Sequence, residues 1–402
     1  MSTAVIVSAV RTPIGKRFGS LSGWHPVELA AEVIAAVVER SGVDPTTIDD
    51  VIMGCVSQVG PQSTNIARNA ALAAGLPETV PGTTIDRQCG SSQQAIHFAA
   101  QAVLSGAQDV VLAAGVECMS TVPMFSNAPG GDIRAVYGEK LMARYADRET
   151  FGVSGLVPQG LSAESIVAQW ELSREELDAY ALSSQRRAAA ARAEGRFERE
   201  IVPVQRKVRD RETGEVTVHD ELFTTDECIR ESSAETLAGL KPSFLPEGKV
   251  TAGNASQIVD GAAALLVMRE ETARELGLQP IAAIRQMSVI GADPVAMLTA
   301  PIPATRLALT KSGMAAEEID LYEVNEAFAP VVLAWQKEIG IGLEKVNVNG
   351  GGISLGHPLG ASGARLMVTL IHELQRSEGR FGLQTMCEGG GMANATIIER
   401  LS

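Results

Sequence analysis

Short apolar segments alternate with helical ones along most of the chain, and this alternation occurs twice. In the first copy the strand-like segments are 4–10, 50–56, 80–85 and 110–114, and the helical segments are 27–40, 65–74 and 93–104. In the second copy the strand-like segments are 281–290, 321–324, 346–348, 383–387 and 395–400, and the helical segments are 303–312, 331–339 and 361–375. Short apolar strands separated by helices indicate an α/β protein whose sheet is mostly parallel and covered on both faces. The repetition predicts two similar α/β halves.

The stretch between the two copies is richer in charge and loops. Ser173 and Glu176 form a capping box that starts one long helix, and Gly195 is a natural stop for it. Within 201–219, segments on both sides of a Glu-Thr-Gly turn predict a hairpin. We therefore expect three parts: an N-terminal half over 1–120 that is completed by about 250–278, an inserted loop domain over 121–249 that lies over the core, and a C-terminal half over 279–402.

The composition excludes several classes of function. The 402 residues carry a formal net charge of −14 and no run rich in Lys or Arg, which argues against nucleic acid or an anionic membrane as a partner. No apolar run approaches the length of a membrane span, and residues 4–10 are expected to form a first strand rather than a signal peptide. The five cysteines are widely spaced and lack a C-x-x-C pair. We therefore expect no zinc cage and a reducing compartment, by default the cytoplasm.

Cys89 lies where a predicted strand turns into a predicted helix, and small residues surround it. Backbone N–H groups at a helix start carry partial positive charge, which favours a thiolate, and an accessible thiolate is a nucleophile. Most free cysteines are simply small buried hydrophobes. This stretch alone leaves both interpretations open.

Three C-terminal stretches also carry polar groups at strand ends or in glycine-rich turns. They are Asn325-Glu326-Ala327-Phe328-Ala329, the run 350–363 with His357, and Cys387-Glu388-Gly389-Gly390-Gly391. Neither glycine run fits the dinucleotide-binding spacing G-x-G-x-x-G. Taken singly, His357 fits a structural histidine, Asn325 a helix cap, and Glu326 or Glu388 either a general base or a capping carboxylate. The His357 turn holds the same place in the second half as the Cys89 turn in the first, so we expect the two to meet.

Together these stretches resemble the thiolase family over the whole chain. The matching motifs, in the family's order, are Arg11-Thr12-Pro13-Ile14-Gly15-Lys16, the Cys89 turn, Gly248-Lys249-Val250-Thr251-Ala252-Gly253-Asn254-Ala255-Ser256, Asp260-Gly261-Ala262-Ala263, Asn325-Glu326-Ala327-Phe328, Gly356-His357-Pro358 and Cys387 with its three glycines. The resemblance implies two α/β halves with mixed five-stranded sheets in a layered α-β-α-β-α arrangement, plus the inserted loop domain. It also implies thiolytic cleavage of a 3-ketoacyl-CoA by coenzyme A, and the reverse Claisen condensation, without a metal or bound cofactor.

The resemblance also implies residue roles. Cys89 matches the acylated nucleophile, His357 the base that takes its proton, and Cys387 the second acid/base. Asn325 matches the residue that holds a water beside His357, and the backbone amides of Cys89 and Gly389 match the donors that stabilise the tetrahedral oxyanion. The implied contacts with coenzyme A are Ser256, Ala327, Phe328, Arg230 and Phe244. A homo-oligomer, dimer or tetramer, is implied as well.

Alternatives remain at this stage. Pro158 stands where biosynthetic, acetoacetyl-forming relatives carry His, so it favours a degradative enzyme, with the biosynthetic one as the alternative. Residues 297–300 and 393–394 depart from the family's pattern near the acyl pocket, so chain length is not implied. A ketoacyl synthase would use two histidines and lack Asn325 and Cys387. A non-catalytic acyl-CoA-binding protein would be expected to lack one of the reactive residues, and all are present.

Overall fold

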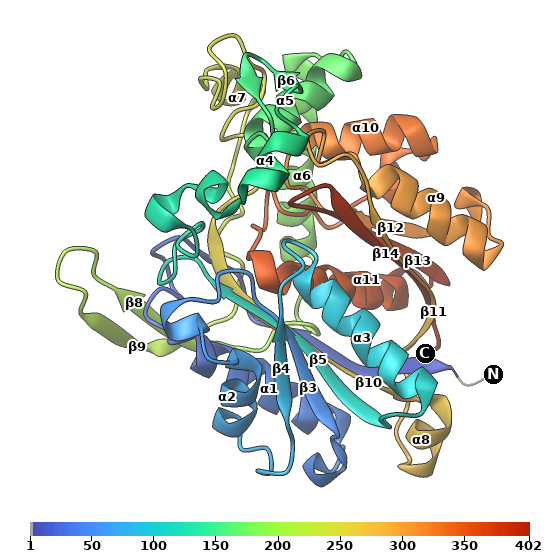
Figure 1. The fold of residues 1–402 in the computed structure, drawn as a ribbon. Helices are drawn as coiled ribbons and strands as arrows, with labels where there is room; N and C mark the ends of the chain where they lie inside the picture. Colours follow the sequence, from blue (N-terminus) through green and yellow to red (C-terminus); the bar gives the residue numbers. More distant parts are fainter. Residues whose placement is uncertain (1–2) are drawn as a thin grey trace.

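The computed structural model describes residues 3–402, and a single sheet runs through them (Figure 1). Its ten strands have the order β12-β13-β14-β11-β1-β10-β5-β3-β4, with β2 paired to β10. The strands are β1 (Ala4–Arg11), β2 (Gly15–Lys16), β3 (Asp50–Gly54), β4 (Gly82–Ile85), β5 (Val110–Cys118), β10 (Val259–Arg269), β11 (Ala282–Gly291), β12 (Leu321–Val324), β13 (Phe381–Glu388) and β14 (Met392–Arg400). The first half supplies β1 to β5 and β10, the second supplies β11 to β14, and a short antiparallel pairing of β1 with β11 joins them.

The expectation of a mostly parallel sheet is wrong. Only β3 with β4, β3 with β5 and β12 with β13 pair in parallel, and the other ladders of the sheet are antiparallel. The reason is local for β13 and β14, which a three-residue glycine turn connects as a hairpin. In the first half, β10 returns after the inserted segment and lies between β1 and β5, antiparallel to both.

The strand expected at 346–348 is also wrong, because Val346 makes only an isolated bridge to Tyr322. Asn347 has a φ of 49°, in the left-handed region that does not continue a strand. Its side chain pairs with β12 instead: Val324 N donates to Asn347 Oδ1 at 2.8 Å, and Asn347 Nδ2 donates to Val324 O at 2.9 Å. The C-terminal half therefore has four strands, and a side-chain amide replaces the ladder of the fifth.

Helices form three layers around the sheet (Figure 1). Apolar residues of α3 and α11 pack together in the centre, against both halves. One outer layer packs on the first half and the other on the second. The helices of these layers are α1 (Pro26–Ser41) and α2 (Ile66–Ala73), α3 (Ser91–Ser105) and α11 (Ser362–Ser377), and α9 (Pro301–Ser312) and α10 (Ala329–Ile339), with the short α8 (Glu270–Glu275) after β10. Within residues 3–402 no helix has the length and apolar content that crossing a bilayer requires.

The segment between β5 and β10 forms the upper part and one flank of the molecule in Figure 1. Its elements are α4 (Glu139–Arg144), β6 (Glu149–Thr150), β7 (Val153–Ser154), α5 (Gln159–Gln169), α6 (Arg174–Ala193), β8 (Val204–Arg209), β9 (Val216–Phe223) and α7 (Ala234–Ala238). The predicted capping box is confirmed, because Glu176 N donates to Ser173 Oγ at 3.0 Å and Ser173 N donates to Glu176 Oε2 at 2.6 Å. The predicted hairpin is confirmed as the antiparallel pair β8–β9.

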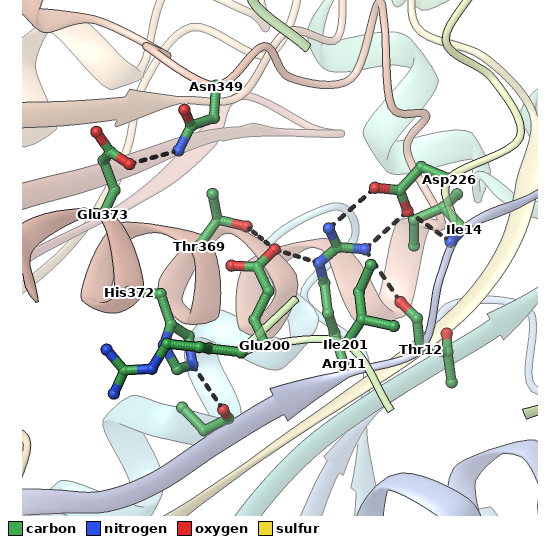
Figure 2. A network of polar contacts seen from close by, with 12 residues as sticks. Arg11, Thr12, Ile14, Glu200, Ile201, Asp226, Asn349, Thr369, His372 and Glu373 are labelled. Atoms are coloured by element: carbon green, nitrogen blue, oxygen red, sulfur yellow. Dashed lines mark hydrogen bonds and ion pairs between the residues drawn. The ribbon is translucent and has the colours of Figure 1, made fainter. Parts of the chain in front are cut away.

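A buried ion-pair network ties this segment to the core (Figure 2). Arg11, at the end of β1, is fully buried; its Nε lies 2.6 Å from Glu200 Oε1 and its Nη1 2.7 Å from Asp226 Oδ1. Thr369 of α11 donates to Glu200 at 3.1 Å, and Ile14 N donates to Asp226 at 2.8 Å. Burial opposes the charge on Arg11, but the two carboxylates outweigh it and raise the pKa of the guanidinium.

We expect Arg11→Met to lower the free energy of unfolding by about 3–5 kcal/mol, because it leaves two buried carboxylates without their cation. Urea unfolding followed by circular dichroism measures this. Arg206→Met is the matched control, since Arg206 pairs with the exposed Glu221 and is expected to lose less than about 1 kcal/mol. Equal losses in the two variants would contradict a stabilising role of the buried network.

Candidate active site

The turn between β4 and α3 holds Cys89 in a strained backbone. Gln88, immediately before it, has a φ of 49°, a left-handed conformation that is costly for a residue with a side chain. Asp86 Oδ1 accepts from Gln88 N at 2.6 Å, and Ser91 Oγ accepts from Arg87 N at 2.9 Å while donating to Gln88 O at 2.6 Å. These bonds fix Cys89 at the start of α3. The preceding strand β4 lies at the sheet edge and is half-buried, not buried as the sequence indicated.

The two halves meet at the N-terminal turns of α3 and α11, as the sequence predicted. Ala364 N donates to Ser92 Oγ at 2.8 Å. A β-carbon at Gly363 would lie 2.2 Å from Gln93 N, so only glycine permits this approach. Cys89 itself belongs to one buried apolar cluster with Leu366 of α11. The helix contact therefore brings the Cys89 turn to the second half.

His357 is buried in the turn before α11, and its hydrogen bonds fix its tautomer. Ser362 Oγ forms hydrogen bonds with both Pro358 O, at 2.9 Å, and His357 Nδ1. Because its single proton is donated to the carbonyl oxygen of Pro358, the hydroxyl accepts a hydrogen bond from His357 Nδ1. The proton therefore resides on Nδ1 and the lone pair on Nε2, where Asn325 Nδ2 approaches to 3.5 Å. Burial, and secondarily Arg365, lowers the pKa of His357 to about 3. At neutral pH Nε2 is an uncharged proton acceptor.

Asn325 follows β12 and joins His357 to the second cysteine. Its Nδ2 also lies 3.8 Å from Cys387 Sγ, while its buried Oδ1 has no partner within residues 3–402. Burial raises the pKa of Cys387 to about 12, although the Asn325 contact opposes this, and Glu388 adds to the rise. Cys387 is therefore a protonated thiol at neutral pH and can act as an acid.

Cys89 is also a thiol in the resting state. Burial, followed by the neighbouring Cys387 and Glu388, raises its pKa well above the ordinary value. The sequence-based expectation that the helix start favours a thiolate is therefore outweighed by desolvation. Cys89 could therefore act as a nucleophile only if a neighbouring base removed this proton.

Comparison with known proteins shows the family of this chain. Residues 4–271 match the family description "Thiolase, N-terminal domain", and residues 278–400 match "Thiolase, C-terminal domain". The chain belongs to the thiolase family. A steroid 3-ketoacyl-CoA thiolase, FadA6, from Mycobacterium tuberculosis is 50% identical over 406 aligned residues, which cover 100% of this chain and 95% of that protein. A 3-ketoacyl-CoA thiolase from Citrobacter koseri is 44% identical, with 100% of both chains covered.

A solved structure supports the same conclusion. The acetyl-CoA acetyltransferase of Bacillus anthracis has a TM-score of 0.87 and 44% identity, and the match covers 100% of this chain and 99% of that chain. This thiolase is therefore an acyltransferase that acts on CoA thioesters, and the expected thiolase-like α/β fold is confirmed. Its reaction is the CoA-dependent thiolytic cleavage of 3-ketoacyl-CoA and the reverse condensation.

Glu326 holds the thiolase's glycine-rich turn in place. It accepts from Tyr180 Oη and Ser184 Oγ, both at 2.8 Å, and from Ile353 N at 3.0 Å. With these bonds both carboxylate oxygens are occupied, so its position argues for a structural role rather than for a general base. Tyr180 and Ser184 belong to α6, so the carboxylate also joins the inserted segment to the turn.

The expected coenzyme A contacts lie together except for one. Ser256 N donates to Ala327 O at 3.0 Å, and the rings of Phe244 and Phe328 meet edge to face with centroids 5.9 Å apart. Arg230 has an exposed side chain, and its backbone N–H donates to a side chain of α6. Nothing in these contacts ties its guanidinium to the other four residues. Within residues 3–402, no three His, Cys, Asp or Glu side chains are grouped for metal binding.

Two residues of this site carry contacts that the sequence reasoning did not foresee. Glu117, at the end of β5, accepts from Val56 N and Gly360 N, both at 2.9 Å, and so links the two halves. Ser362 sets the His357 tautomer. Two sequence features could have indicated these contacts: Glu117 is an acidic residue at the end of a buried strand, and Ser362 carries a hydroxyl five residues after His357.

We expect Ser362→Ala to lower kcat/KM by about tenfold to a hundredfold, because the buried Nδ1 proton loses its acceptor and the tautomer is no longer fixed. Steady-state thiolysis measures this. Ser165→Ala, which removes a hydroxyl from α5 away from the histidine, is the control and is expected to resemble the wild type. Full activity of Ser362→Ala would contradict the tautomer assignment.

Proposed function

We propose that this thiolase works in the degradative direction, with Cys89 as the nucleophile, His357 as its base and Cys387 as the second acid/base. One observation carries the proposal. A neutral imidazole nitrogen, the Asn325 amide and a buried thiol converge in one half, and the other half delivers a second buried thiol to them.

In the first half-reaction, His357 Nε2 takes the proton from Cys89 Sγ, and the thiolate attacks the 3-keto carbon. The bond between C2 and C3 then breaks, which leaves an acyl group on Cys89 and the enolate of acetyl-CoA. Cys387 donates its proton to C2 of that enolate. In the second half-reaction, the thiol of incoming coenzyme A gives its proton to Cys387 and attacks the acyl group. Cys89 leaves as a thiolate and recovers its proton from His357.

Two donor sets would stabilise the negative oxygens. The backbone amides of Cys89 and Gly389 serve the tetrahedral intermediate, and His357 with a water held by Asn325 serves the enolate. The unpartnered Oδ1 of Asn325 supports such a water. Losing one donor of this kind raises a barrier by about 3 kcal/mol. Side chains, backbone and coenzyme A account for every proton and bond, so we propose no metal and no bound cofactor.

The acyl group is proposed to be bulky and apolar. A cavity of about 290 Å³ opens beside Gly390, next to the proposed oxyanion donor. Its walls are formed by aromatic and aliphatic side chains from the inserted segment and the loop after β11, including Tyr137, Leu141, Tyr145, Leu156 and Met297. This size is close to that of ligand pockets, which begin at about 300 Å³. The M. tuberculosis relative is named for steroid substrates, which fits a wide acyl site. Acetoacetyl-CoA formation is the second candidate.

A homo-oligomer, in a cytoplasmic location, completes the proposal. Strand β4 is an open sheet edge, and next to it α3 exposes Phe98 and Leu104, each 39% accessible. An open edge with exposed apolar side chains is a surface that a second copy can cover. All five cysteines are free, which fits a reducing compartment. Light scattering after size exclusion measures the assembly, and a monomer at micromolar concentration would contradict this part.

Cys89→Ala is expected to lose at least about a thousandfold in thiolysis, since no nucleophile remains. Cys387→Ala is expected to lose about a hundredfold to ten-thousandfold, but Cys89 should still take up radiolabel from acetyl-CoA, because acyl transfer needs no C2 proton and the departing coenzyme A thiolate is stable enough to take its proton from water instead of Cys387. Turnover and label retained on protein are measured for both variants. Thiolysis by folded Cys89→Ala, or absence of label in Cys387→Ala, would contradict the assigned roles.

The acyl-site proposal predicts higher kcat/KM for 3-ketoacyl-CoA with cyclic or long acyl groups than for acetoacetyl-CoA. Leu141→Trp, which fills the cavity, should lower the first value by about tenfold and leave the second nearly unchanged. Leu222→Trp, a similar change on the exposed β9, is the control. A wild type that prefers acetoacetyl-CoA would favour the biosynthetic alternative.

A further inference from the structure

Glu388 is a buried acid that the reaction above does not use. It directly follows Cys387 at the end of β13, and its side chain is fully buried. Neither carboxylate oxygen has a well-formed hydrogen bond among the described residues 3–402, although the backbone N–H of Asn394 faces it. Successive strand residues point to opposite faces, so Glu388 points away from the face that carries Cys387. Burying an unpaired polar group costs free energy, so its presence beside the active site requires an explanation.

The carboxyl group lies against the turn that carries Cys89. A β-carbon at Gly90 would be 1.9 Å from Glu388 Oε1, so the carboxyl occupies the space that any larger residue there would need. In the opposite direction, a β-carbon at Gly389 would be 2.9 Å from Gln88 Oε1. Each turn therefore places a side chain on a glycine of the other. These two contacts place the turn of the proposed nucleophile directly against the turn that carries the proposed oxyanion donor.

The groups around the carboxyl do not neutralise it. Asp86 and Arg87, from the turn before α3, are its charged neighbours, and the thiols of Cys89 and Cys387 are the other titratable groups close to it. Arg87 forms no ion pair with Glu388 in the described chain. Its Nη1 lies instead 3.8 Å from the sulfur of Met392, the β14 residue that pairs with Glu388. Burial raises the pKa of Glu388 to about 8, with Arg87 and the backbone N–H of Asn394 opposing. At neutral pH it is an uncharged acid.

We propose that Glu388 is a positioning residue that braces the Cys89 turn as an uncharged acid, and that its ionisation sets the alkaline limit of turnover. The inference rests on the proposed roles of Cys89 and Cys387. Each half-reaction builds negative charge on Cys89 or on the enolate beside Cys387. A carboxylate behind both thiols would repel that charge and would lose its dry position on Gly90. The proton that Glu388 releases goes to solvent.

The test compares wild type with Glu388→Gln, which keeps the shape and removes the charge. The first readout is the rate of Cys89 alkylation by iodoacetamide, with Cys89→Ala as the background. At pH 6.5, where Glu388 is protonated, the two proteins should react at similar rates. At pH 9 the variant should react faster by about tenfold or more, because no like charge opposes the thiolate. A purely structural effect would change the ratio equally at both pH values.

The second readout is kcat/KM for thiolysis between pH 6 and 10, compared between variants at each pH because coenzyme A also ionises in this range. The wild type should fall above about pH 8, and the fall should be smaller in Glu388→Gln. Glu323→Gln is the matched control, since Glu323 is also buried with one unpartnered oxygen and a raised pKa, but its charged neighbours are Arg365 and other carboxylates rather than Cys89 or Cys387. Its profile should follow the wild type.

Equal alkylation ratios at both pH values, an unchanged alkaline fall in Glu388→Gln, or the same shift in Glu323→Gln would overturn the inference. If Glu388→Gln does not fold, Glu388→Leu removes the same charge at similar size and is expected to give the same shift. Thiolysis by Cys89→Ala would instead overturn the proposed function, whatever the Glu388 variants do.

Discussion

The active site depends on how closely the N-terminal turns of α3 and α11 approach each other. Ala364 N donates to Ser92 Oγ at 2.8 Å, and Gly363 lies so close to Gln93 that a β-carbon would be 2.2 Å from Gln93 N. Each helix begins just after the turn that holds one reactive group. A side chain at the contact would separate the helices, and displacements of about 1 Å at reacting groups cost about a hundredfold in rate. Fold and chemistry therefore share one constraint.

Buried carboxylates hold the irregular turns at this contact. Turns make no ladder, so their buried N–H groups need other acceptors. Glu117 accepts from N–H groups of both halves, Glu326 accepts from the glycine-rich turn and from α6, and Asp226 accepts from Ile14 while pairing with Arg11 (Figure 2). Each carboxylate joins segments that are far apart in sequence. These carboxylates thus anchor buried turns that lie outside strands and helices.

The sequence predicted most helices and strands, because hydrophobic periodicity and turn chemistry are local properties, and it predicted the family, because the motifs are specific. It failed where non-local contacts decide. The sheet is not mostly parallel because β10, which returns after the inserted segment, pairs antiparallel with its neighbours. The strand expected at 346–348 is absent because the Asn347 side chain makes the hydrogen bonds to β12 instead. The roles of Glu117 and Ser362 depend on partners brought from the other half or from the turn geometry. The expected thiolate at Cys89 failed because burial is a property of the folded chain.

The resting site contains almost no charge, and this follows from its burial. Cys89 and Cys387 are thiols, and His357 is a neutral imidazole, all for the same reason of desolvation. In the proposed mechanism negative charge therefore arises only as the reaction proceeds, beside the backbone amides of Cys89 and Gly389 that we propose as its donors. Interactions that strengthen only when charge develops lower the barrier rather than the ground state. For the same reason, the proposed role of Glu388 requires that it stay protonated during turnover, because a carboxylate beside the two thiols would oppose the developing negative charge.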